Sequence, residues 1–294
     1  MGASLSSLTD NESTRGKPSL GDIPENCVEC VFMYLNPPEI CNLARLNRAF
    51  RRAASSDAVW DSKLRVNAHQ LLDVLPQRKK YEGFSKKDIF ALLSRPVAFD
   101  DGNKTLQEVW LDRISGRICM SISTKAMLIT SGEDRRHWNW FPTDESRFHV
   151  VAYCQQVWWF EVGGSVKFPF PPDVYTLTFR VHLGKFYKRL GRRVCNFEHT
   201  HGWDLGPVRY ELSTSDGQHI VSESSIHDSD QGGNWIEYKV GEFIVSRSDP
   251  ATEVRFSMKQ IDCTHSKGGL CVDSVSIVPS DLKGRRRKRV LKYH

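Results

Sequence analysis

Apolar residues recur every three or four positions between Leu20 and Leu64, which is the spacing of an amphipathic helix. Asn36 and the pair Pro37-Pro38 interrupt this pattern, and proline is tolerated where an early helical amide has no partner. The spacing predicts three short helices. Because so small a unit cannot bury the whole stripe, we expect a partner protein to cover it. The apolar positions are Ile23, Cys27, Val28, Val31, Phe32, Leu35, Ile40, Leu43, Leu46, Phe50, Val59 and Trp60.

A second helical pattern lies after this segment. Ser85 and Asp88 have the three-residue spacing of a capping box, and the apolar residues from Ile89 to Leu93 follow them. Pro96 is expected to end the helix. We therefore predict a partly helical connector over residues 67–109.

From Trp110 onward the apolar period changes to two. Apolar and polar residues alternate over 175–183 and again over 253–259, which is typical of antiparallel strands with one buried face. Many short strands separated by Gly, Pro, Asp and Ser turns predict an all-β sandwich of jelly-roll type over residues 110–280. The chain as a whole is thus expected to be a multidomain α+β protein. The other predicted strands are 117–121, 149–153, 157–162, 209–213, 235–240 and 270–278.

The length of 294 residues suits about two domains. No run of eighteen apolar residues occurs, and the polar residues 1–19 do not resemble a signal peptide, so we expect a disordered N-terminus and no membrane span. The eight cysteines are scattered without tight spacing, which suits reduced thiols. These features indicate a protein of the cytoplasm, the nucleus or both.

Neither a metal site nor catalysis is expected. Cys27 and Cys30 fall within a predicted helix without a second pair, and Cys195, His199 and His201 lack a fourth ligand at suitable spacing. The chain has no GxSxG, P-loop or HExxH motif. We therefore predict no catalytic residues, metal or cofactor.

Positive charge is concentrated at the C-terminus. Residues 283–292 carry seven of the 41 Lys and Arg residues, and without them 34 basic residues face 35 acidic ones. The basic tail, residues 281–294, is either a nuclear-import signal or a solubilising segment. Because the rest of the chain is nearly neutral, no specific nucleic-acid surface is expected. Gly184 to Arg193, GKFYKRLGRR, either stacks single-stranded bases or forms a surface loop, and the loop is preferred.

Met1-Gly2 with Ser6 matches the short pattern for N-myristoylation. Gly2 is therefore a candidate lipidation site. A single acyl chain would anchor the protein only weakly.

The segment 20–66 resembles an F-box, the module by which SCF-type ubiquitin ligases hold their substrate receptors. The resemblance rests on the opening Ile-Pro, the proline-containing turn, the string Asn47-Arg48-Ala49-Phe50-Arg51 and the closing Val59-Trp60. It implies docking to a Skp-type adaptor and, through it, to a cullin ligase core. A helical subdomain that folds back on its own chain is the alternative. The predicted adaptor contacts are Ile23, Pro24, Val28, Val31, Phe32, Leu35, Pro38, Ile40 and Leu43.

Four strings in the β-rich segment resemble the phloem protein 2, or Nictaba-like, lectin domain of plants. They are ITSGEDRRHWNW, VWWFEVGGSV, NWIEYKVGEFIV and CTHSKGGLCVDSVSIVP. The resemblance implies recognition of N-acetylglucosamine-containing glycans on glycoproteins. Together with the F-box, it is similar to the plant F-box proteins that carry this domain.

In lectins of this family two tryptophans seven residues apart and two glutamates seven residues apart bind the sugar. The corresponding positions here are Ser131, Trp138, Glu253 and Gln260. Ser131 lacks an aromatic face and Gln260 lacks a charge, so a protein ligand is an alternative to a glycan. Glu253 and Gln260 also differ in strand parity and require a bulge to face one site. We expect Trp158, Trp159 and Trp235 to be buried.

The sequence therefore predicts a non-catalytic substrate receptor of an SCF ubiquitin ligase, in which the F-box holds the adaptor and the sandwich selects a target. The alternatives are a free-standing lectin with a vestigial F-box and an RNA-binding protein.

Overall fold

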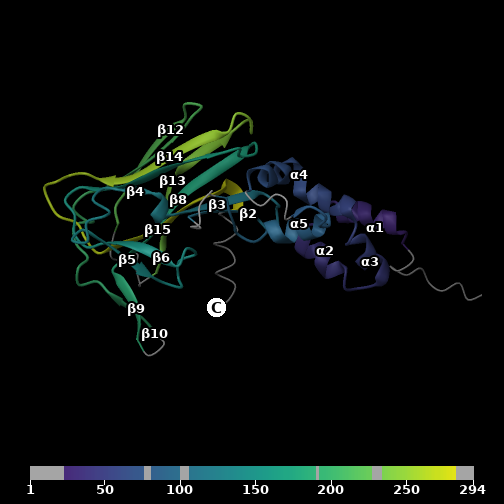
Figure 1. Ribbon diagram of the computed structural model, residues 1–294, viewed down its shortest axis with the longest axis horizontal. Helices are drawn as coiled ribbons and strands as arrows, with labels where there is room; N and C mark the ends of the chain where they lie inside the picture. Colours follow the sequence, from purple (N-terminus) through teal and green to yellow (C-terminus); the bar gives the residue numbers. More distant parts are fainter. Residues whose placement is uncertain (1–22, 76–80, 100–105, 190–191, 227–233, 283–294) are drawn as a thin grey trace, which may run out of the picture. The chain divides into compact units, whose positions relative to one another are not determined.

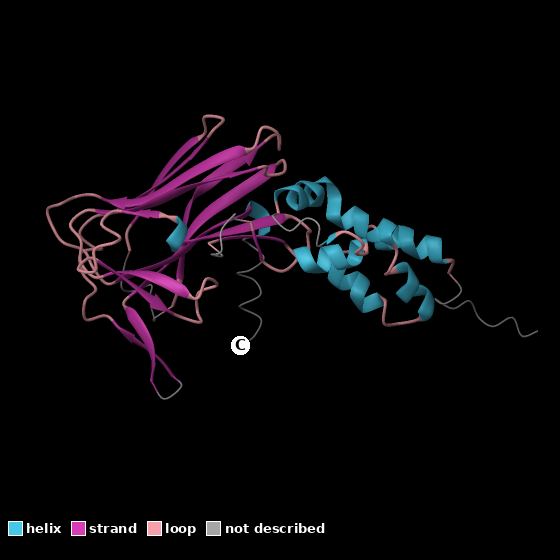
Figure 2. Ribbon diagram, viewed as in Figure 1, coloured by secondary structure: helices cyan, strands magenta, loops and turns pink. Residues whose placement is uncertain are grey.

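The computed structural model describes residues 23–75, 81–99, 106–189, 192–226 and 234–282 (Figure 1). The N-terminal segment 1–19, the candidate lipidation site Gly2 and the basic tail beyond Leu282 lie outside these ranges. The chain divides into two compact units, the first ending at Lys63 and the second beginning at Leu64. Figure 2 separates the helices, in cyan, from the strands, in magenta.

The first unit is built from short helices: α1 (Glu25–Phe32), α2 (Pro37–Leu43), α3 (Arg48–Ala53) and the start of α4 (Asp57–Val74). The sequence predicted three helices and a boundary after residue 66. The helix α4 instead runs through that boundary, because the segment from Asp57 to Val74 contains neither proline nor glycine.

Asparagine side chains fix the starts of α2 and α3. The Asn36 side chain accepts a hydrogen bond from the Glu39 amide at 3.0 Å, while the Glu39 carboxylate accepts one from the Asn36 amide at 2.9 Å. This is a complete capping box, which the apolar spacing did not predict. Asn47 caps α3 by accepting from the Phe50 amide at 2.8 Å. The two caps therefore define the turns between the helices.

A small aromatic core holds these helices together. The Phe32 and Phe50 rings meet edge to face, with centroids 5.8 Å apart. Trp60 is buried and donates its indole N–H to the Ala54 carbonyl at 2.8 Å. Because its only polar atom is satisfied, Trp60 can close the core without an unpaired group.

The second unit begins with the rest of α4 and with α5 (Lys86–Leu93). The Ser85 hydroxyl accepts from the Asp88 amide at 3.2 Å, as the predicted cap requires. The Asp88 carboxylate accepts a hydrogen bond from the Ser85 hydroxyl at 2.6 Å rather than from a backbone amide. The helix ends at Leu93, before Pro96.

Two large antiparallel sheets and the two-stranded hairpin β9–β10 make up most of the remainder. One has eight strands, in the order β1-β2-β3-β15-β6-β5, with β8 joining β15 to β13; the other has five, in the order β12-β11-β14-β7-β4. The strands are β1 (Val97–Ala98), β2 (Gln107–Leu111), β3 (Ile118–Ser123), β4 (Leu128–Ile129), β5 (Trp138–Pro142), β6 (Val150–Cys154), β7 (Phe160–Phe168), β8 (Asp173–Leu183), β9 (Lys185–Arg189), β10 (Arg192–Asn196), β11 (Val208–Thr214), β12 (His219–Ser224), β13 (Ile236–Val245), β14 (Thr252–Gln260) and β15 (Leu270–Pro279).

Aromatic rings from the two sheets meet between them. Phe179 of β8 packs against Phe256 of β14, with centroids 5.9 Å apart, and against Tyr210 of β11 at 6.1 Å. All three side chains are buried. The α+β class, with helices first and an antiparallel β-rich domain after them, is therefore confirmed.

Residues 184–193 were predicted as a surface loop and instead lie largely in a hairpin, β9–β10, which extends from the sandwich (Figure 1). Phe186 anchors it, because its buried ring packs on Phe141 at 5.5 Å and near Tyr153. Alternation along β9 places Phe186 inward while Tyr187 is exposed.

Candidate functional site

The helical unit exposes apolar side chains that do not pack into its own core. Val28 and Phe32, four residues apart on α1, point into the core. Val31 lies on another face of the helix and is 57% exposed, and Tyr34, just beyond the helix, is 91% exposed. The helical period thus separates core residues from residues that a partner can contact.

The nine predicted adaptor contacts fall into two groups. Val28, Phe32 and Ile40 are at most 3% exposed, so they hold the helices together and offer no free surface. A docking partner can therefore reach only the other six. Ile23, Pro24, Val31 and Pro38 are exposed, and Leu35 and Leu43 are half-buried.

Three further apolar residues are exposed here but were absent from the predicted contacts: Met33, Tyr34 and Leu46. Tyr34 and Met33 fall outside the three-and-four spacing by which the contacts were selected. Leu46 belonged to the pattern, and its position in the turn before α3 explains its exposure. Arg48, Arg51 and Arg52 on α3 are also exposed.

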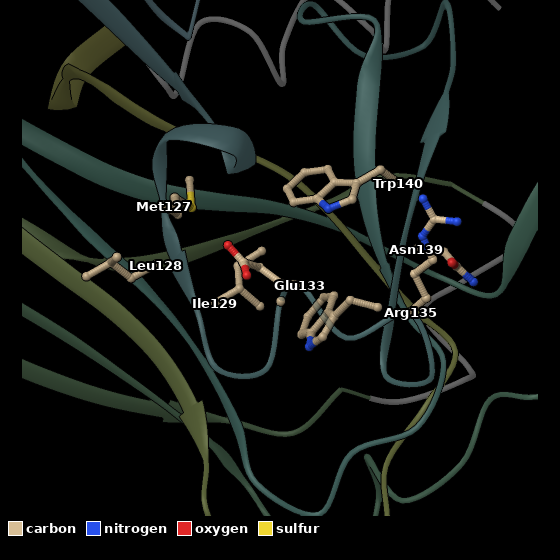
Figure 3. A pocket seen from close by; sticks show the side chains of 9 residues that line it. Met127, Leu128, Ile129, Glu133, Arg135, Asn139 and Trp140 are labelled. Carbon is tan, nitrogen blue, oxygen red and sulfur yellow. The ribbon is translucent and has the colours of Figure 1, made fainter.

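The second unit contains a pocket of about 610 Å³ between β4 and β5 (Figure 3). Apolar side chains and three polar ones surround it, and Glu133 projects between Trp140 and Ile129 in Figure 3. The residues that line it are Met127, Leu128, Ile129, Gly132, Glu133, Arg135, Trp138, Asn139 and Trp140.

The turn from Thr130 to His137 shapes this pocket and is held by its own hydrogen bonds. Gly132 is required there, because a Cβ atom would lie 2.9 Å from Ile129 Cβ. Arg136 binds Asp134 through Nε and Nη2, at 3.1 and 2.7 Å, and thereby lowers the pKa of that carboxyl to about 2. The Gln155 side chain donates to the Arg135 carbonyl at 2.6 Å and fixes the turn to the strand ladder.

The two pocket tryptophans have different environments. Trp138 is 2% exposed, stacks on Phe160 at 5.9 Å and donates its indole N–H to the Thr130 carbonyl at 3.2 Å. Trp140 is 40% exposed, and Lys125 Nζ lies 5.9 Å from its ring centroid. Trp140 rather than Trp138 therefore offers an aromatic face to a ligand.

The four predicted sugar-binding residues do not converge. Ser131 lies in the pocket-forming turn, with a φ of 58°, and Trp138 begins the next strand. Glu253 and Gln260 lie on β14, whose register with β7 is continuous, so no bulge brings them to one face. Seven residues of strand separate them by about 23 Å.

Their local contacts differ as well. Glu253 is on the solvent face and binds Arg255 Nε and Nη2 at 3.0 and 3.1 Å, which lowers the pKa of its carboxyl. Gln260 is buried and donates to the Gly206 carbonyl at 2.7 Å. A single sugar cannot contact both side chains in this arrangement.

The predicted burial of Trp158 and Trp159 is wrong. They are 52% and 46% exposed, because β7 begins only at Phe160 and the two residues form a bend before it. Trp159 donates its indole N–H to the Glu161 carboxylate at 3.1 Å. Trp235 is half-buried, with the Arg180 guanidinium 4.2 Å from its ring centroid.

The candidate metal ligands are not gathered. Cys195 lies 3.8 Å from His182 Nε2, whereas His201 contacts Ser266. Within the described residues, no group of three His, Cys, Asp or Glu side chains has metal-binding geometry. All eight cysteines are free thiols. No helix in the described part of the chain is long and apolar enough to cross a bilayer.

Comparisons with known proteins agree with both units. Residues 20–65 match the family described as F-box-like, and residues 117–279 match the family described as Phloem protein 2. The Arabidopsis thaliana protein named F-box protein PP2-A15 is 64% identical over 304 residues, which span 99% of each chain. F-box protein PP2-A13 of the same plant is 54% identical across 90% of each chain. The chain therefore belongs to the family of plant F-box proteins that carry a phloem protein 2 domain.

Proposed function

We propose that this protein is a non-catalytic substrate receptor of an SCF ubiquitin ligase. Its helical unit docks a Skp-type adaptor, which joins it to the cullin core, and its phloem protein 2 domain selects the target. Ubiquitination follows from proximity, because tethering raises the local concentration of the target near the ubiquitin-loaded enzyme.

One observation carries the proposal: the F-box helices have a complete core and still expose apolar side chains. Val31 and Tyr34 are 57% and 91% exposed although Phe32, between them, is buried. Contiguous exposed apolar residues mark interaction surfaces. The free thiols also suit a reducing compartment, the cytoplasm or the nucleus, which we include in the proposal.

The test is capture of the full-length chain by an immobilised Skp-type adaptor. Val31→Lys places a charge on the exposed apolar face of α1 and should weaken capture about tenfold or more, because an apolar residue of the proposed interface is replaced. Lysine near a helix C-terminus is favourable, so the fold should persist. Val221→Lys, at an exposed valine on β12, is the matched control and should leave capture unchanged.

A free-standing lectin is the second candidate, and the exposed ring of Trp140 in a pocket that Glu133 also lines favours it. It predicts that neither the wild type nor Val31→Lys binds the adaptor, and that the chain binds chitotriose. Trp140→Ala should then abolish chitotriose binding, whereas Trp158→Ala, at an exposed indole outside the pocket, should not. Adaptor capture together with pocket-dependent chitotriose binding would instead indicate a receptor for N-glycosylated targets.

A further inference from the structure

Three loops meet at one end of the sandwich, where the loops gather at the left of Figure 1. Lys267 joins two of them: its Nζ donates to the Trp158 carbonyl at 2.6 Å and to the Asp262 carbonyl at 2.5 Å. The third loop is tied in by His265, which contacts the Gly202 carbonyl at 3.1 Å. Gln260 adds the hydrogen bond to Gly206. Residues 155–159, 197–206 and 261–266 therefore form one connected surface.

This loop-end surface exposes several large apolar side chains. Trp158, Trp159, Leu205 and Ile261 are all exposed. The hydrogen bonds of Lys267 and Gln260 act on the backbone of these residues or of their neighbours, so the loops are held while the apolar side chains face solvent. A preorganised apolar surface loses little conformational entropy when a ligand covers it.

The charged side chains within these three loops are acidic, and the adjoining turn carries Arg135 and Arg136, of which Arg136 is paired with Asp134. The three loops contain Glu198, Asp204 and Asp262 and no lysine or arginine, although the whole chain has a formal charge of +6. These three residues are exposed, and no ion pair with another described residue involves them. Lys267, beneath the surface, is fully buried and engaged by carbonyl oxygens, and Lys259 is held between Glu161 and Glu211.

We propose that the loop-end surface binds a polypeptide segment of the target in which basic residues flank an apolar anchor. The anchor packs on Trp158, Leu205 and Ile261, and the basic residues face Asp204, Asp262 and Glu198. This inference rests on the proposed receptor function, for which it names the class of target. Trp158, Leu205 and Ile261 do not line the pocket that contains Trp140, although Gln155 of these loops contacts the Arg135 carbonyl at the edge of that pocket.

The charge pattern distinguishes this ligand from the alternatives. A strongly acidic or phosphorylated segment would meet three carboxylates, and like charges across an interface disfavour association. A nucleic acid would meet the same repulsion and would find no exposed lysine or arginine in these loops. A basic segment gains both the apolar contact and the electrostatic attraction.

The probe is a capped peptide, Arg-Arg-Leu-Phe-Leu-Arg-Arg, titrated into the full-length protein by calorimetry. The control peptide has glutamate in place of each arginine. We expect the basic peptide to bind and the acidic peptide to bind at least about tenfold more weakly. Binding of the basic peptide should weaken as salt rises, because exposed charges are screened.

Two sets of variants locate the site. Trp158→Ala keeps the carbonyl that Lys267 contacts and should weaken peptide binding about fivefold or more. The double change Asp204→Asn and Asp262→Asn should weaken it about threefold and flatten the salt dependence. Trp140→Ala, at an exposed indole in the pocket, is the control and should have no effect.

The proposal is overturned by no peptide binding up to about 1 mM, by equal binding of the basic and acidic peptides, or by loss with Trp140→Ala but not with Trp158→Ala. Adaptor capture, measured on the same preparations, reports the receptor function independently. Normal capture without peptide binding would reject this surface alone. Failed capture with loop-dependent peptide binding would reject the receptor function and keep the surface.

Discussion

The helical unit and the sandwich differ in where they leave apolar side chains exposed. In the helical unit, the exposed Val31 lies on the same helix as the core residues Val28 and Phe32. In the sandwich, the core is filled by rings from both sheets, and Trp158, Leu205 and Ile261 are exposed on the loops that connect strands. One unit thus presents a face of a helix, and the other presents loops above a closed core.

Size explains this difference. A short helical unit has a high ratio of surface to volume and cannot enclose two faces of the same helix. The sandwich is large enough to bury Phe160, Phe179 and Phe243 completely, so its loops are free to vary. We therefore expect mutations in the sandwich core to affect stability, and mutations on the exposed helical face to affect binding.

The largest expected effect is in the aromatic core of the sandwich. Phe160 is fully buried between Trp138, at 5.9 Å, and Trp203, at 4.9 Å. Phe160→Ala should lower the free energy of unfolding by about 3–5 kcal/mol, because it removes apolar burial and leaves a cavity. Denaturant titration followed by tryptophan fluorescence measures this. A loss below about 1 kcal/mol for Phe160→Ala would contradict the closed core. The control, Val31→Ala, should change the free energy of unfolding little.

The next effect concerns the buried lysine beneath the loops. Burial lowers the pKa of Lys267, whose ammonium group is held by three carbonyl oxygens. Lys267→Met keeps the aliphatic stem but leaves these acceptors without a donor, so we expect a loss of about 2–3 kcal/mol. Amide exchange should accelerate at residues 262–265.

Lys259→Met is the matched control, because Lys259 forms ion pairs on the solvent face of the sheet. It should cost less than about 1 kcal/mol. Equal losses for the two variants would show that the buried hydrogen bonds do not hold the loops.

Alkaline pH should destabilise the sandwich through its buried tyrosines. Burial raises the pKa of Tyr153 to about 12 and also raises the pKa values of Tyr175 and Tyr210. A raised pKa in the folded state contributes stability that is complete below pH 10 and is lost as the pH rises toward 12. At pH 11, Tyr153 alone should account for about 1 kcal/mol.

Urea midpoints at pH 8 and pH 11, for the wild type and Tyr153→Phe, measure this contribution. Tyr153→Phe should lose less stability than the wild type between pH 8 and pH 11. Lys267 acts in the opposite sense because its pKa is lowered, but both proteins retain it, so the comparison isolates Tyr153. An equal pH dependence in both proteins would remove Tyr153 as the cause.

The smallest expected effect is at the capping box of the helical unit. Asn36→Ala removes the acceptor of the Glu39 amide and should cost about 0.5–1 kcal/mol. Because Val31 and Tyr34 precede this turn, adaptor capture should weaken about twofold to threefold. Asn36→Asp retains an acceptor, so its free energy of unfolding and its adaptor capture should match those of the wild type. A loss with Asn36→Asp as large as with Asn36→Ala would show that the cap is not responsible.

Much of the fold could be predicted from local pattern. The alternation over 175–183 and 253–259 lies within β8 and β14, each of which is two residues longer than the predicted range. The hairpin β9–β10 was missed because its basic composition is typical of a surface loop. The tertiary contact of Phe186 with Phe141 is what holds the hairpin in place. The continuation of α4 past residue 66 could have been predicted from the absence of proline and glycine.

The site was less predictable. Strand parity correctly indicated that Glu253 and Gln260 face opposite sides unless a bulge intervenes, and the continuous register contains none. Nothing local showed that Trp138 is buried while Trp140, two residues later, is exposed. Lys267 carried no sequence signal for burial, because its environment comes from the carbonyl groups of residues 158, 262 and 265.

The sequence by itself determined the identity and order of the two units, since helical and strand periods and family motifs are properties of contiguous residues. It also determined which residues are apolar. Only the tertiary structure decided which of these residues are covered, that Val28 is core while Val31 is surface, and that hydrogen bonds of Lys267 and His265 join three distant loops. The reason is physical: periodicity specifies the face of an element, but burial depends on what packs against that face.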